Sequence, residues 1–192
     1  MLIRRLVALL ALIIALPATA ASVLPLYLDE IIDTAATAFQ GTCTGNRTER
    51  DAQTGLIVTY TTFLVQERLK GDVGTSITIK QIGGRLSDGS MEFEMPGVPT
   101  FAVGGSYVVF LHGVSQAGFS SPVGLGQGRF TIIAGENGAQ VTNGRDFKDM
   151  ASRIAGSAPR EAQAKLSARG PVMRLGLDDF KALVRQRSGP IQ

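Results

Sequence analysis

Two glutamates and one histidine are the side chains of this sequence best suited to acid–base chemistry. Glu92 and Glu94 stand two residues apart, so on a strand their carboxylates share a face about 7 Å apart. A carboxylate pair at that spacing can serve a glycosidase, although the solvated side of an edge strand gives the same pattern. His112 is the only histidine, and a catalytic triad would have to use it as the base. A secreted hydrolase using Glu92 and Glu94 or His112 is therefore one alternative.

Three glycines at every second position raise the question of a phosphate-binding loop. Gly124, Gly126 and Gly128 precede the segment 129–133, which is rich in β-branched and apolar residues and predicts a strand. A dinucleotide-binding loop needs a helix at this point. A period of two instead predicts that the glycines share one face of a strand, where a backbone or helix can approach closely. We expect no nucleotide and no other cofactor.

The segment 83–100 is the candidate binding surface. It is irregular and rich in glycine and proline, and long loops in small domains often carry function. Its charged residues Arg85, Glu92 and Glu94 are the predicted binding residues. The sequence offers no Gly-x-Ser-x-Gly elbow and, with one cysteine and one histidine, no Cys/His metal box. These patterns favour a non-catalytic binding or accessory module over an enzyme.

The first twenty residues have the three parts of a secretory signal peptide. Arg4 and Arg5 precede an apolar run over 6–16, and Ala18-Thr19-Ala20 has the small-x-small pattern of a cleavage site. A retained N-terminal anchor is the alternative, but the run is shorter than the ~20 residues that span a bilayer. We therefore predict an exported protein, periplasmic or secreted, with no transmembrane segment after removal of residues 1–20.

Charge is distributed unevenly along the chain. Residues 145–192 hold ten Lys and Arg against five Asp and Glu, whereas residues 21–144 hold seven against eleven. We expect a solvated basic helix face. A basic tail of this kind can also pair with the acidic body or meet an anionic surface, which leaves a structural, envelope-associated protein as another alternative. With no Trp and few aromatic residues, a nucleic-acid partner is not expected. The expected partner is a protein or a component of the envelope.

Apolar periodicity predicts a helix at each end of the chain and strands between them. Leu28, Ile31, Ile32 and Ala35 form one helical stripe. Alternating or β-branched segments predict strands over 39–43, 56–67, 76–82, 106–111, 123–133 and 139–141, with a short edge strand over 91–95. Residues 46–55 are polar and predict a loop. Helices are expected over 147–154, 159–168 and 177–187.

These elements predict a mainly β fold. The expected architecture is a small, closed or nearly closed five- to six-stranded OB-like barrel with an N-terminal helix and C-terminal helices. The predicted organisation is a signal peptide over 1–20, a β-barrel domain with its N-terminal helix over 21–144, and a basic helical tail over 145–192. Cys43 is the only cysteine and is expected to be a small buried side chain on a strand.

A set of short motifs resembles a group of exported bacterial proteins of unassigned function. The motifs are LKG at 69–71, Q-x-G-G at 81–84, YVVFL at 107–111 and G-x-x-Q-G-x-F at 124–130, and the resemblance covers about 26–133. The strand order is also similar to the netrin-like, OB-type barrels of metalloproteinase inhibitors. Those inhibitors use an N-terminal cysteine, whereas Cys43 is internal, so the resemblance implies export and the barrel but assigns no inhibitory residue.

Overall fold

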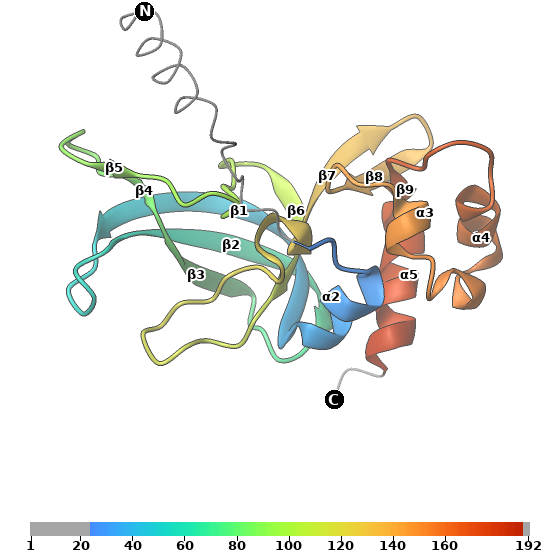
Figure 1. The fold of residues 1–192 in the computed structure, drawn as a ribbon, viewed down its shortest axis with the longest axis horizontal. Coiled ribbons are helices and arrows are strands. Elements are labelled where there is room, and N and C mark those ends of the chain that lie inside the picture. Colours follow the sequence, from blue (N-terminus) through green and yellow to red (C-terminus); the bar gives the residue numbers. More distant parts are fainter. Residues whose placement is uncertain (1–23, 190–192) are drawn as a thin grey trace, which may run out of the picture.

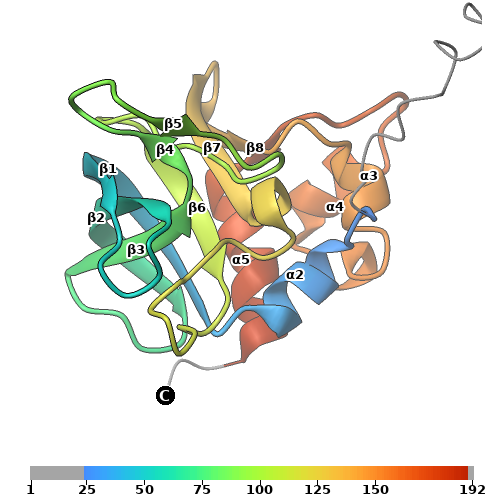
Figure 2. The same ribbon diagram turned by 60° about the vertical axis from the view of Figure 1, so that its left-hand side comes forward.

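The computed structural model describes residues 24–189 of the chain. The predicted signal peptide, residues 1–20, lies outside the described residues. Within them, a seven-stranded sheet and a two-stranded sheet are accompanied by four α-helices (Figure 1). The helices gather at one end of the molecule and the hairpin of the small sheet lies at the other (Figures 1 and 2). The prediction of a mainly β fold with an N-terminal helix and C-terminal helices is confirmed.

The large sheet is antiparallel, in the order β3-β2-β1-β6-β7-β8-β9. Its strands are β1 (Thr37–Arg50), β2 (Ile57–Lys70), β3 (Ser76–Ile82), β6 (Ser106–Leu111), β7 (Arg129–Gly135), β8 (Gly138–Thr142) and β9 (Leu175–Gly176). The first three strands form a meander. Between residues 24 and 189, no pairing joins the outer strands β3 and β9, so the predicted closed or nearly closed barrel of five to six strands is not seen.

The helices form near the predicted positions, but the helix expected over 147–154 ends at Met150 and continues as turns. They are α2 (Leu28–Thr34), α3 (Phe147–Met150), α4 (Arg160–Leu166) and α5 (Leu177–Ser188). In α2, the stripe of Leu28, Ile31 and Ile32 is completely buried. The Glu30 carboxylate accepts a hydrogen bond of 2.9 Å from the backbone N–H of Tyr27. This bond, aided by Arg153, lowers the pKa of Glu30, as suits an acid at a helix N-terminus.

Four phenylalanine rings join the helices of the tail to the sheet. Phe110 of β6 and Phe130 of β7 meet Phe147 of α3 and Phe180 of α5, and all four rings are fully buried. The centroids of Phe130 and Phe180 lie 4.6 Å apart. Aromatic rings at such distances add to the free energy gained by burying their area. The tail therefore shares one hydrophobic core with α2 and the sheet.

Ion pairs also connect the basic tail with β2 and α2. Lys181 of α5 lies 3.1 Å from the Glu67 carboxylate of β2, which also binds Arg185. Arg187 pairs with Asp33 at the end of α2 and lowers the pKa of that carboxyl. The tail is thus not only the expected solvated basic face: the alternative of attraction to the acidic body is observed.

A second core lies on the opposite face of β1, β2 and β6. Phe39, Phe63, Phe101 and Tyr107 pack there edge to face, and the Phe63 and Phe101 centroids are 4.9 Å apart. Cys43 is fully buried among them, and burial raises the pKa of its thiol. The prediction of a small buried side chain on a strand is confirmed.

A buried ion pair fixes the turn between β1 and β2 against β3. The Lys80 ammonium lies 2.7 Å from the Asp51 carboxylate, and both side chains are less than one-tenth exposed. Lys80 also donates to the Ala117 carbonyl, whereas Asp51 accepts from the backbone and hydroxyl of Thr54. The hydrogen bond from Lys80, followed by those from Thr54, lowers the pKa of Asp51 to about 2.

The predicted polar loop over 46–55 is wrong in its first half. Strand β1 continues to Arg50 and pairs with β2 throughout. Cross-strand bonds replace the missing apolar contacts: the hydroxyls of Thr48 and Thr59 lie 2.9 Å apart, and the Thr61 hydroxyl donates to the Asn46 side chain. Polar residues therefore form a strand here because their partners lie on the neighbouring strand.

The predicted glycine face of a strand is also wrong. Gly124 and Leu125 both have φ near +60°, residues Leu125–Gly128 form a 3₁₀ turn, and β7 begins only at Arg129. The loop holds the first described residues: the Gln127 amide donates to the Leu24 carbonyl and accepts from the Leu26 N–H. The glycines let the loop turn tightly enough to place this amide.

Candidate functional site

A cavity of about 600 Å³ lies between the ends of β1, β2 and β3 and the segment that follows β3. This volume falls within the range of small-ligand sites. The candidate binding segment 83–100 forms one wall, and the strands form the floor. The lining residues are Asn46, Thr48, Thr59, Thr61, Gln81, Ile82, Gly83, Gly84, Arg85, Glu92, Phe93, Glu94, Met95, Pro96, Gly97, Val98, Pro99, Thr100 and Phe101.

The floor of the cavity is uncharged and polar. Asn46 pairs in register with Thr61, and Thr48 with Thr59, so these four side chains share the inner face of the hairpin. A register shift between Cys43 and Gly45 allows this arrangement. The shift changes which side chains of β1 face inward. The inner face is therefore apolar up to Cys43 and polar from Asn46 onward, where the cavity begins.

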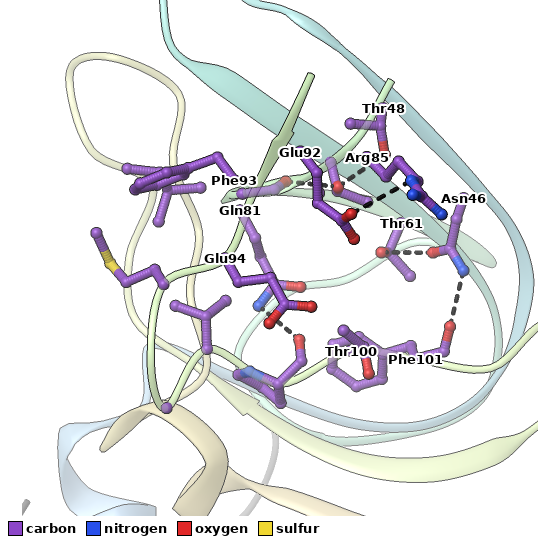
Figure 3. A pocket seen from close by; sticks show the side chains of 18 of the residues that line it. Asn46, Thr48, Thr61, Gln81, Arg85, Glu92, Phe93, Glu94, Thr100 and Phe101 are labelled. Atoms are coloured by element: carbon purple, nitrogen blue, oxygen red, sulfur yellow. Dashed lines mark hydrogen bonds and ion pairs between the residues drawn. The ribbon is translucent and has the colours of Figure 1, made fainter. Parts of the chain in front are cut away.

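The wall of the cavity is a short hairpin. β4 (Gly84–Arg85) pairs with β5 (Glu92–Phe93), and the chain then continues to Phe101. The Arg85 Nε atom lies 3.3 Å from a carboxylate oxygen of Glu92, and both side chains are exposed. In Figure 3 the carboxylates of Glu92 and Glu94 extend into the cavity, and Phe93, which points to the other side of its strand, also lines it. The structure thus brings together all three predicted binding residues.

Glycines let the hairpin approach the floor. At Gly84, φ is +129° and a Cβ would lie 2.2 Å from the Thr59 hydroxyl. Gly97, with φ of +85°, lies so close to Leu125 that a Cβ would be 2.8 Å from its side chain. Both ends of the hairpin are therefore positions that only glycine occupies without strain. Between them, residues 87–97 are exposed.

Apolar side chains alternate with the glutamates along the hairpin, and two of them, Phe93 and Met95, also line the cavity. Met91, Phe93 and Met95 alternate with the two glutamates and are exposed to 42%, 42% and 39%. Exposed apolar side chains are unremarkable singly, but a contiguous group beside a cavity marks an interaction surface. Methionine adapts its shape easily to different partners. The hairpin thus offers both carboxylates and adaptable apolar side chains to the cavity, with Met91 next to it in sequence.

The charges of the cavity are two carboxylates and one guanidinium. Glu92 is paired with Arg85, whereas Glu94 has no ion-pair partner among residues 24–189. In the same range, no three His, Cys, Asp or Glu side chains are placed to hold a metal ion together. Hydrogen bonding and ion pairing with a bound group are chemistry that these three side chains can perform.

His112 is not part of this cavity. It follows β6, is exposed, and its backbone N–H donates to the Ser121 carbonyl. The structure therefore brings Glu92 and Glu94 to one place and leaves His112 at another. Sequence reasoning missed the floor residues. Their signal was the alternation of polar side chains along 46–48 and 59–61, which is visible only once the pairing of β1 with β2 is known.

Comparison with other proteins provides no family assignment. No family model matches the chain, and no curated protein or solved structure is significantly similar to it. The resemblance to exported bacterial proteins and to netrin-like barrels stays a prediction. Among the helices within residues 24–189, none combines the length and apolar character that crossing a membrane requires.

Proposed function

We propose that this protein is an exported, non-catalytic binding or accessory module of the bacterial cell envelope or secretome. Its partner would bind in the cavity between the β1–β3 floor and the hairpin of β4 and β5. The observation that carries this proposal is the convergence of Arg85, Glu92 and Glu94 on one cavity with a polar floor. Export is proposed from the signal-peptide pattern of residues 1–20.

The arrangement around the glutamates favours binding over hydrolysis. A glycosidase of this kind needs two carboxyl groups that both act on the substrate, one as the acid and the other as the base or nucleophile. Glu92 is instead exposed and paired with the positive charge of Arg85. His112 does not line this cavity, so it cannot act as a base on a ligand bound between Glu92 and Glu94.

The alternative of a structural envelope protein held by its basic tail has less support. Lys181 and Arg185 bind Glu67, Arg187 binds Asp33, and Arg153 binds Glu30 within the chain. Charges used in this way are less available to an anionic surface. We also propose that the strand arrangement is OB-like, because long strands with register shifts, as in β1 and β2, are typical of sheets that coil.

Crosslinked affinity capture tests the proposed binding function. Immobilised protein comprising residues 21–192 is exposed to exported proteins and envelope fragments of the source organism, and bound material is identified by mass spectrometry. A triple variant with alanine at Arg85, Glu92 and Glu94 is compared with a matched control. The control has alanine at Glu136, Asp149 and Arg160, which are exposed and outside the cavity.

The wild type and the control should recover one partner repeatedly, and the cavity variant should lose it at a nearly unchanged melting temperature. Recovery of nothing above a denatured control, or equal recovery by all three proteins, would remove this cavity from consideration. The hydrolase alternative is tested separately: loss of a measured activity in Glu92→Gln or His112→Ala, with the fold intact, would support it.

A further inference from the structure

The threonine hydroxyls on the floor of the cavity already donate hydrogen bonds to other groups of the protein. The Thr59 hydroxyl donates to the Gly83 carbonyl at 2.7 Å, and the Thr61 hydroxyl donates to the Asn46 side-chain oxygen at 2.7 Å. Since a hydroxyl has one hydrogen, Thr48 must be the donor in its 2.9 Å bond to Thr59. These three threonines therefore present only lone pairs to a ligand.

The amides of the floor are partly used in the same way. The Asn46 side-chain N–H donates to the Phe101 carbonyl at 2.7 Å, and the Gln81 side-chain N–H donates to the Pro99 carbonyl at 3.3 Å. Two carboxylates, which only accept hydrogen bonds when ionised, face this floor from the hairpin. Apart from the Arg85 guanidinium, these side chains offer mainly acceptors, and they match a ligand that supplies N–H groups.

Arg85 shows which kind of N–H group suits the carboxylates. Its guanidinium already binds Glu92 at 3.3 Å, although both side chains remain exposed. An exposed pair of this kind contributes little to stability, so a ligand can replace Arg85 without destabilising the fold. A ligand can bind the Glu94 carboxylate without displacing another residue, because Glu94 forms no ion pair in the described part of the chain.

The hairpin also indicates how large the ligand is. A small amine would occupy only the space between the two carboxylates. It would leave the adjoining apolar surface of Met91, Phe93 and Met95 uncovered. A peptide in extended conformation places alternate side chains on opposite sides, and thus matches a strand on which acidic and apolar residues alternate. Methionine-rich surfaces with nearby acids suit basic, partly apolar peptide segments.

We propose that the cavity binds an extended peptide segment that carries a lysine or arginine. The cationic group of this residue lies between Glu92 and Glu94, its aliphatic stem follows the wall, and neighbouring apolar residues contact Phe93 and Met95. This inference rests on the proposed binding function and names the chemistry of the partner. It assigns Arg85 the role of an internal competitor, which holds Glu92 while the site is empty.

Three blocked pentapeptides test the proposal by titration into the labelled protein, followed by amide NMR. They are acetyl-Thr-Val-Lys-Val-Thr-amide and its counterparts with norleucine or glutamate at the centre. The lysine peptide should shift the amides of residues 81–101. The norleucine peptide, which keeps the stem but lacks the charge, should bind about tenfold more weakly because charged hydrogen bonds are lost. The glutamate peptide should not bind.

Variants locate the charge effect. Glu94→Gln should weaken the lysine peptide about tenfold, whereas Glu136→Gln, in the β7–β8 turn outside the cavity, should leave binding unchanged. Arg85→Ala should strengthen binding by releasing Glu92, an effect that a purely structural role of Arg85 would not produce. Equal binding of the lysine and norleucine peptides at residues 81–101 would overturn the cationic inference but keep the binding site.

The absence of any shift at residues 81–101 with all three peptides would overturn the peptide assignment, as would shifts confined to other surfaces. Affinity capture then separates the two proposals. A partner that is still lost with the triple alanine variant would leave the binding function standing with a ligand of different chemistry.

Discussion

The helical end of the molecule and the hairpin end use the same residue types for different purposes. Phe180 is fully buried among three other rings, whereas Phe93 is 42% exposed. Glu67 binds two cations of α5, whereas Glu94 binds none within residues 24–189. The comparison shows that one end satisfies its apolar and charged groups internally. The other end leaves both kinds of group available to a ligand.

The largest expected difference between the two ends concerns aromatic truncation. Phe180→Ala should lower the free energy of unfolding by about 3–5 kcal/mol, because it opens a cavity in the core. Phe93→Ala should change it by less than about 0.5 kcal/mol, as at other exposed positions. Urea unfolding measures both values. If both variants lowered the free energy of unfolding equally, Phe93 would be part of the core and would not be available to a ligand.

The buried ion pair of Lys80 and Asp51 should give the next largest effect. Lys80→Ala leaves the Asp51 carboxylate buried without its cation, which is strongly destabilising. The loss should be smaller than for Phe180→Ala and larger than for any surface pair. Lys80→Ala combined with Asp51→Ala should be less harmful than Lys80→Ala alone. A double-mutant cycle in urea measures this recovery, and simple additivity would contradict the pairing.

The same pair predicts a dependence of stability on pH. Because the folded pKa of Asp51 is lowered from 3.8 to about 2, its contribution is present above the unfolded value. It is lost as the pH falls from about 3.8 through about 2. The difference in unfolding free energy between the wild type and Asp51→Asn should therefore shrink across this range. Guanidinium unfolding at a series of pH values tests it, and a constant difference would refute the assignment.

Glycine substitutions within the hairpin should separate its anchor from its tip. Gly84→Ala places a Cβ against Thr59 at a positive φ, whereas Gly89→Ala, also at a positive φ, meets open space. We expect a loss of about 1–3 kcal/mol for Gly84→Ala and about 1 kcal/mol or less for Gly89→Ala. Thermal unfolding measures both. Gly84→Ala should also weaken binding of the lysine peptide. An unchanged affinity would show that ligand recognition does not depend on the cavity shape that Gly84 allows.

The smallest effect should come from the ion pairs of the tail. Glu67→Gln removes the partner of Lys181 and Arg185, and should lower the free energy of unfolding by about 1 kcal/mol or less. Salt should reduce this difference, because it screens the pairs that water reaches. Urea unfolding at low and high salt tests the expectation. An effect that does not respond to salt would indicate packing as its cause.

The sequence predicted the apolar half of the fold better than the polar half. The stripes of α2 and α5 and the apolar run of β6 lie where periodicity placed them. The second half of β1 escaped prediction because Asn46 and Thr48 owe their strand conformation to partners on β2. Such partners lie more than ten residues away in sequence, beyond any local pattern.

Only the hairpin side of the candidate site was predictable from the sequence. Arg85, Glu92 and Glu94 share a segment whose glycines, prolines and charges mark it as an unusual loop. The threonines of the floor carry no such mark, because threonine is a common strand residue. The loop of Gly124 to Gly128 misled for a related reason. Its spacing of two predicts a strand, yet Leu125 adopts a left-handed conformation, and the loop is set by its contact with Leu24 and Leu26.

The long-range contacts of Leu26 and Asp33 have a consequence for the order in which the chain folds. Leu26 is held by Gln127 and Arg145, which follow it by 101 and 119 residues, and Asp33 is held by Arg187, which follows it by 154. Contacts across such separations form late, because long loops must close first. Leu26 and Asp33 of a nascent chain therefore lack these partners until Gln127, Arg145 and Arg187 have been synthesised.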